Sequence, residues 1–303
     1  MLFVNYRVRL KNPNRLCFIN RSPEHIRLSN IYNRIQEDEQ VVSLHSYHLV
    51  DPSPWPFIMS FGLFFLTFGM TMYFHSYRGS YGLIFVGLLL VLGTMFTWFR
   101  DIIREAVYEG QHTKSVQNGL RNGMVLFIFS ELLFFISFFW AFFHSALSPT
   151  PEIGSVWPPL GIETIYAWGI PLLNTIILLS SGATITWAHH SIVCGSRENV
   201  IGGLLITILL AFFFFFIQVY EYMEAPFSIS DGIYGTTFFL LTGFHGLHVI
   251  IGTIFLIVVL IRTIHHHFTK QHHFGLEAAA WYWHFVDVVW LFLFAVVYWW
   301  GGN

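Results

Sequence analysis

The chain has 303 residues, of which 55% are hydrophobic and only 11% are charged. Ordinary soluble domains are about 45–50% apolar and about 25% charged, so this composition argues strongly against a soluble globular enzyme. The formal net charge of −2 gives no electrostatic basis for binding nucleic acid. The two cysteines, Cys17 and Cys194, are too few and too far apart to indicate a disulfide framework or a zinc finger.

Apolar stretches long enough to cross a bilayer recur along the chain. A hydrocarbon core of about 30 Å needs roughly 20 helical residues, because each helical residue rises about 1.5 Å. Backbone polar groups inside lipid must be satisfied within the protein, which favours helices over open strands. The sequence therefore predicts an all-α integral membrane protein with seven transmembrane helices, at approximately residues 57–75, 81–99, 123–143, 166–187, 200–220, 236–261 and 280–300.

Basic residues divide the connecting segments into two sides. Every lysine and arginine except Arg78 falls on the side that holds the N-terminus, called side A here. This asymmetry is typical of positive-inside topology, so we expect side A to be the inner face and the C-terminus to lie on the opposite side, side B. Residues 1–44 lack the apolar core of a secretory signal peptide. They predict a polar extension on side A that precedes a seven-helix domain over residues 45–303.

Glu131 lies well inside the third predicted span, among phenylalanine and leucine residues. An ionised carboxylate in the middle of a membrane helix costs about 2.5–3.5 kcal/mol on insertion scales. We therefore expect Glu131 to face protein or a cavity. Two interpretations stay open: a site that handles protons, or a neutral acid that hydrogen-bonds to a neighbouring helix and holds it in place.

His245 and His248 lie three residues apart, deep in the sixth span and on one helix face. Two histidines on one face are a partial ligand set for haem or copper, but a metal centre needs further ligands from other helices. Gly243 and Gly246 in the same segment favour close helix packing. We therefore interpret these histidines as polar packing residues.

His284 and Asp287 form a similar pair in the last span. A histidine and a carboxylate three residues apart suit a proton relay or half of a metal site, although a polar packing pair is the commoner arrangement. The chain has 16 histidines, which suggests a membrane di-iron enzyme, but no two of them are four residues apart as such sites require. This spacing argues against a self-contained membrane metalloenzyme.

Arginines gather where the predicted spans meet side A. Arg104 follows the second span, and Arg262 ends the sixth span at the same depth. Planar guanidinium groups at headgroup level suit phosphate, since they can bind two oxygens together. Ordinary anchoring of the helix ends explains the arginines equally well, so the residues alone leave both interpretations open.

Acidic residues gather on side B, with Glu221 and Glu224 at the end of the fifth span. Such a surface could attract a cationic partner. A simpler interpretation is that the acidic residues follow from the topology, because the basic residues are on the other side.

Several strings resemble subunit III of cytochrome c oxidase, in the haem-copper oxidase subunit III family and in its mitochondrial form. The resemblance runs in order from about His45 to Gly302. The strings that carry it are HSYHLVDPSPWP (His45–Pro56), SELLFFISFFWAFFHS (Ser130–Ser145), TWAHH (Thr186–His190), EAPFSISDG (Glu224–Gly232), TGFHGLHVIIG (Thr242–Gly252) and FGLEAAAWYWHFVDVVW (Phe274–Trp290).

The resemblance implies a non-catalytic subunit of the terminal respiratory-chain oxidase. Subunit III of that family has seven transmembrane helices in a 2+5 arrangement around a V-shaped cleft filled with phospholipid. It packs beside subunit I, which holds the haems and copper, reduces dioxygen to water and pumps protons. We therefore expect this chain to have no catalytic residue, metal or cofactor of its own. Its partners would be structural phospholipids, subunit I and other subunits of complex IV, with no nucleic acid.

The resemblance also implies roles for single residues and a location. Glu131 would be the carboxylate in the cleft, and five residues would contact lipid headgroups: Trp98, Arg104, Glu105, His112 and Arg262. The subunit would support proton uptake and the stability of subunit I, and would give oxygen a lipid-lined entrance. It would lie in the mitochondrial inner membrane, with its N-terminus in the matrix and its C-terminus in the intermembrane space.

Three other functions stay open at this point. Subunit III of a quinol oxidase would share the fold while serving another electron donor, because donors bind other subunits. A membrane metalloenzyme is disfavoured by the histidine spacing. A solute transporter that uses Glu131 as its proton site would need to act without partners.

Overall fold

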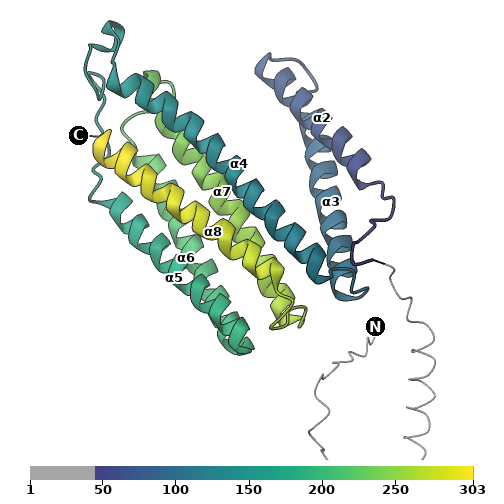
Figure 1. Ribbon diagram of the computed structural model, residues 1–303. Helices are drawn as coiled ribbons and strands as arrows, with labels where there is room; N and C mark the ends of the chain where they lie inside the picture. Colours follow the sequence, from purple (N-terminus) through teal and green to yellow (C-terminus); the bar gives the residue numbers. More distant parts are fainter. Residues whose placement is uncertain (1–44, 303) are drawn as a thin grey trace, which may run out of the picture. The chain divides into compact units, whose positions relative to one another are not determined.

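A computed structural model describes residues 45–302; the predicted extension over residues 1–44 and residue 303 lie outside the described residues. Over this range the chain is helical, with seven helices long and apolar enough to cross a membrane. These are α2 (Trp55–Phe74), α3 (Ser80–Val107), α4 (Lys114–Leu147), α5 (Ile170–Cys194), α6 (Arg197–Glu224), α7 (Gly232–Ile264) and α8 (Phe274–Leu293), and α8 continues as the π-helix η2 (Phe294–Trp300) (Figure 1). The predicted all-α membrane class is confirmed.

Local sequence explains where several helices begin. The fourth long helix starts at Ile170, four residues later than the predicted boundary at Tyr166. Pro171 occupies its first turn, where the missing N–H leaves no hydrogen bond unmade. Thr113 precedes α4, and its Oγ1 accepts a hydrogen bond from the Val116 backbone N–H. α4 has 34 residues. It is therefore roughly 50 Å long and extends beyond a hydrocarbon core.

α2 and α3 pack along each other on glycines. A Cβ atom at Gly87 of α3 would lie 2.5 Å from the backbone nitrogen of Leu66 in α2. A Cβ at Gly69 of α2 would lie 2.8 Å from the backbone nitrogen of Ile84 in α3. Small residues that let two backbones approach are the usual basis of helix association in lipid, where no hydrophobic effect pulls helices together.

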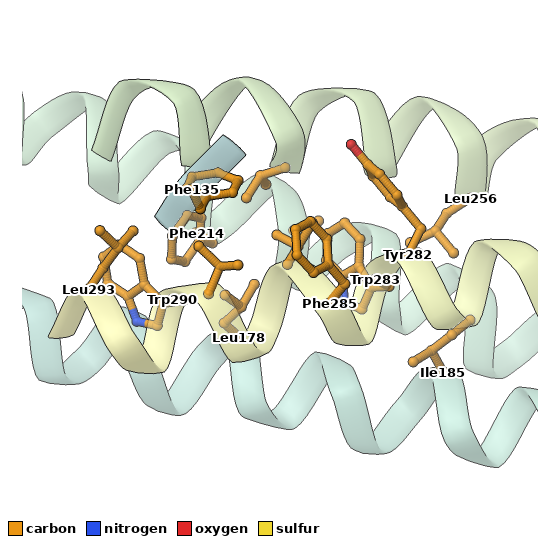
Figure 2. Packing of buried hydrophobic residues seen from close by; sticks show 14 of the residues in the cluster. Phe135, Leu178, Ile185, Phe214, Leu256, Tyr282, Trp283, Phe285, Trp290 and Leu293 are labelled. Carbon is orange, nitrogen blue, oxygen red and sulfur yellow. The ribbon is translucent and has the colours of Figure 1, made fainter. Parts of the chain in front are cut away.

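α8 lies at the centre of the packing among the other helices, in contact with α4, α5 and α7 (Figure 1). Its buried side chains include Tyr282, Trp283, Phe285 and Trp290, which are labelled in Figure 2. Each indole N–H is satisfied by α5: Trp283 donates to Ser181 Oγ at 2.8 Å and Trp290 donates to Thr175 Oγ1 at 2.9 Å. Buried tryptophans thus combine packing with specific hydrogen bonds.

The glycines that allow close approach on α7 are not the predicted ones. No described atom lies within 4 Å of a Cβ built at Gly246, and the nearest atom to one at Gly243 is the Tyr222 hydroxyl at 3.9 Å. Gly252 is the tight position, because its Cβ would lie 3.0 Å from Trp283. The interpretation of Gly243 and Gly246 as packing residues is therefore wrong: the helix faces another way at that depth.

Candidate functional site

Glu131 and His248 form a pair inside the membrane-spanning region. Glu131 Oε2 of α4 lies 3.0 Å from His248 Nε2 of α7. The side chain of Glu131 is 25% exposed and that of His248 is 9% exposed. The His248 ring also packs 4.9 Å from the Phe135 ring, between centroids. The carboxylate therefore faces protein, as the cost of exposing it to lipid requires.

The second ring nitrogen of His248 fixes how protons are shared in this pair. His248 Nδ1 lies 2.6 Å from the Phe244 carbonyl oxygen, which can only accept, so Nδ1 carries a proton. The Nε2–Oε2 contact then joins either a neutral imidazole and a carboxylic acid, or an imidazolium and a carboxylate. In both cases one proton lies between the two side chains and the pair as a whole is neutral.

Replacing Glu131 by glutamine is expected to leave assembly and haem content of the oxidase complex intact. The glutamine amide can donate to the neutral His248 Nε2, so the link between α4 and α7 is kept. Replacing His248 by leucine keeps the contact with Phe135 but leaves the acid without its partner, at a cost of about 1–3 kcal/mol. Native gels, haem absorbance and thermal denaturation of the purified complex measure both effects. If the glutamine variant alone fails to assemble, the fold needs a negative charge here and the neutral-pair interpretation is wrong.

The other predicted intramembrane residues have weaker partners. His245 Nε2 lies 3.3 Å from the Val286 carbonyl oxygen, and its buried Nδ1 has no hydrogen-bond partner among the described residues. His284 Nδ1 is 3.8 Å from Asp287 Oδ2, and His284 Nε2 is 3.2 Å from Thr186 Oγ1. The buried Oδ1 of Asp287 has no partner in the described part of the chain. His245 therefore contacts α8, and His284 contacts α5, while each pair keeps an unsatisfied buried atom. The predicted roles of His245–His248 and His284–Asp287 as polar packing pairs stay predictions.

Two of the predicted headgroup residues, Glu105 and His112, come together near side A. His112 and Glu105 face each other with His48, and their ligand atoms all lie within 4.8 Å of one another. Burial lowers the pKa of His112 below its ordinary value, and the charges of His48 and Arg262 lower it further. The guanidinium carbon of Arg262 lies 4.4 Å from the centre of the Phe268 ring.

Trp98 and Arg104 also lie on α3. Trp98 is half-buried and Arg104 is exposed. α3 is anchored nearby by Asp101, which accepts a 2.7 Å hydrogen bond from the Trp55 indole of α2. Of the five predicted headgroup residues, the structure brings Glu105 and His112 together, and the lipid contacts of all five stay predictions.

Two groups of side chains have a composition that can hold a metal ion. One is the cluster of His48, Glu105 and His112, and the other consists of His189, His273 and Glu277. In the second group Glu277 is already bound by Arg121 at 2.7 Å and by His273 at 3.2 Å. The expectation that the chain holds no metal stays a prediction.

A buried polar network near side B was missed by sequence reasoning. Glu221 of α6 is only 2% exposed, and its Oε1 accepts hydrogen bonds from the Tyr298 hydroxyl at 2.6 Å and from Gln218 Nε2 at 2.9 Å. Asn174 of α5 donates to Gln218 Oε1 at 3.3 Å. Glu221 had been grouped with the acidic surface of side B. The available signal was Gln218, a polar residue three positions earlier on the same helix face.

These features define a class of protein: a multi-pass helical membrane protein in which some acidic groups are bound by side chains of another helix, as in Glu131–His248 and Glu221–Tyr298. The family model described as cytochrome c oxidase subunit III matches residues 45–302. Relatives named "Cytochrome c oxidase subunit 3" include one from Marchantia polymorpha, 62% identical over 259 residues, which are 86% of this chain and 98% of the relative. Another, from Arabidopsis thaliana, is 61% identical over 258 residues, which are 85% of this chain and 97% of the relative. The chain belongs to the cytochrome c oxidase subunit III family.

Proposed function

We propose that this chain is a non-catalytic, phospholipid-binding core subunit of cytochrome c oxidase in the mitochondrial inner membrane. It packs beside subunit I, which reduces dioxygen and pumps protons, and supports proton uptake and stability there. The names of its relatives favour cytochrome c over quinol as the electron donor of the complex. Oxidation of ferrocytochrome c by the purified complex, compared with oxidation of a quinol, tests this assignment.

Arg262 carries the lipid-binding part of the proposal. Its buried Nε has no hydrogen-bond partner among the described residues, and none of the described salt bridges includes it. The Phe268 ring lies under the guanidinium but accepts no conventional hydrogen bond, so the buried Nε–H is left unsatisfied at a cost. A phosphate oxygen is the partner that a guanidinium binds best. The charge of Arg262 acts on His112, which lies within 4.8 Å of Glu105 by their ligand atoms. This arrangement supports a phospholipid headgroup as the missing partner.

The arrangement of the helices supports the rest of the assignment. α2 packs extensively on α3, while α4 to α8 pack on one another, as a cleft between two and five helices requires. The basic residues of side A favour the matrix for that side and for the N-terminus. In the proposed assembly, phospholipid fills the cleft on whose side-A end Arg262 lies.

Replacing both Arg104 and Arg262 by alanine is expected to deplete phospholipid from the purified complex and to shorten its active lifetime during turnover. Loss of hydrogen bonds from charged groups costs about 1.5–3 kcal/mol each, so affinity for a headgroup falls about tenfold or more. Phosphorus content per haem and the decay of oxygen consumption measure the two effects.

Lys114→Ala is the matched control, because Lys114 is an exposed basic residue at the start of α4. This variant should leave the phosphorus content per haem and the decay of oxygen consumption at their wild-type values. Unchanged phosphorus content in the double variant would contradict the headgroup assignment, even if the complex lost activity for other reasons.

A further inference from the structure

A cavity lined by two basic side chains lies at the side-A ends of three membrane-spanning helices. It has a volume of about 270 Å³ and lies between the end of α5, the start of α6, the end of α7 and the segment that follows α7. Pockets that enclose drug-sized molecules are about 300–1,000 Å³, so this cavity suits a smaller group. Its position at the helix ends corresponds to the level of lipid headgroups.

Two cations line the cavity without a carboxylate to neutralise them. Arg197 Nε donates to the Thr263 carbonyl oxygen at 3.0 Å, and its Nη2 donates to the Ile264 carbonyl oxygen. Lys270 Nζ donates to the Cys194 carbonyl oxygen at 2.8 Å. Neither cation takes part in a salt bridge among the described residues.

The charge that remains in the cavity is positive. The carbonyl oxygens that Arg197 and Lys270 bind belong to the C-terminal ends of α7 and α5, each of which carries about half a negative charge. Two full positive charges exceed these two partial ones. Arginine has five N–H donors and lysine has three, so both side chains keep donors free for a ligand.

The glycine at the end of α5 lets the Lys270 side chain lie against the backbone at the edge of the cavity. Gly195 ends α5 in the left-handed region, with φ of +85°, which favours glycine. A Cβ atom at Gly195 would overlap the side chain of Lys270. The same glycine therefore ends the helix and leaves room for the lysine to cross it. Ile192, Val200 and Phe268 add apolar walls beside the two cations.

We propose that this cavity binds a phosphate group, carried either by an anionic phospholipid or by phosphate free in solution. The positive charge, the free donors and the small volume fit a phosphate, and the apolar walls fit an attached glycerol and acyl chain. The cavity contains none of the five residues assigned to lipid headgroups above. Its wall residue Phe268 nevertheless lies under the Arg262 guanidinium, so the cavity adjoins the proposed headgroup site and the lipid form of this inference rests on the proposed function. Dependence on Arg197 and Lys270, rather than on Arg104 and Arg262, distinguishes the two sites.

The test uses the purified oxidase complex and two probes. In phosphatidylcholine vesicles that contain a photoreactive phosphatidylglycerol, we expect labelling of the segments 192–200 and 263–270. In detergent, equilibrium dialysis measures binding of ³²P-labelled inorganic phosphate. Arg197→Gln/Lys270→Gln should lower the signal about tenfold or more, since each lost charged hydrogen bond costs about 1.5–3 kcal/mol.

Two further variants keep the test decisive. Lys270→Arg keeps the charge and should retain binding, and the exposed Lys114→Gln should not change it. If the double variant does not assemble, Lys270→Gln alone is used, with a loss of several-fold expected. Lipid labelling that depends on Arg197 and Lys270 identifies a phospholipid, and phosphate binding with the same dependence but no labelling identifies the free anion. The proposal is overturned if neither probe binds the wild-type cavity, or if both bind the glutamine variant equally well.

Discussion

Replacing Gly87 by valine is expected to separate α2 from α3. The Cβ at this position would lie 2.5 Å from the Leu66 backbone nitrogen and 2.9 Å from its Cα, so backbone and not a flexible side chain blocks it. Overpacking in a core costs about 1–3 kcal/mol when neighbours can shift, and here one whole helix must move. We therefore expect a loss at or above the upper end of that range. Thermal denaturation of the purified complex and its yield on native gels measure it.

Gly82 supplies the control for this substitution. It lies on the same helix, and no described atom is within 4 Å of a Cβ built there. Gly82→Val therefore makes the same change in composition, in the first turn of the same helix, without the collision. Equal destabilisation by the two variants would show that the cost arises within α3 and not from its contact with α2.

Replacing Trp283 by alanine is expected to have an effect of similar size on α5, α7 and α8. Trp283 is fully buried, packs on Gly252 and donates a hydrogen bond to Ser181. Truncation of a buried tryptophan costs about 3–5 kcal/mol in water-soluble proteins. Part of that cost is transfer from water, which is absent when the unfolded helices stay in lipid. We therefore expect about 3 kcal/mol, from the cavity and from the lost hydrogen bond to Ser181, whose hydroxyl keeps its own bond to the Leu178 carbonyl oxygen.

The comparison is with Trp140→Ala on α4, because Trp140 is 72% exposed and loses no internal packing when truncated. Detergent or heat titration that follows retention of the subunit in the complex reports both variants. A Trp283→Ala complex as stable as the wild type would mean that the bundle relaxes into the cavity. The hydrogen bond from the indole to Ser181 would then contribute little to the stability of the complex.

The membrane helices could be predicted from the sequence because one quantity decides them, the length of an apolar run against the thickness of a bilayer. The start of α5 was harder to place. Tyr166 and Trp168 are apolar enough to belong to the span, and only the turn before Ile170 excludes them from the helix. An apolar run includes such residues because only their hydropathy is considered. The backbone conformation shows that they precede the helix.

The candidate site was predictable in kind but not in detail. The cost of a charge in lipid indicates that Glu131 needs a partner, but His248 is on another helix and only the packing of α4 on α7 selects it. For Glu221, in contrast, the sequence did not indicate that the side chain is buried. Its place near the end of a span suggested the surface, while Tyr298 reaches it from the far end of the chain. Both partners depend on helix rotation, which residue spacing alone does not report.

The π-helix at the end of the chain has a consequence for that rotation. In η2 the Gly301 backbone N–H bonds to the Val296 carbonyl oxygen, five residues earlier instead of four. The extra residue in the turn shifts everything after it by about 100° around the axis, since an α-helix turns 3.6 residues per revolution. Deleting a single residue within 294–297 would let the ordinary helical turn re-form. The lost residue and the lost wide turn would then cancel, so the tyrosine would stay directed at Glu221. If the turn became α-helical without a deletion, Tyr298 would instead rotate away from Glu221 by about 100°.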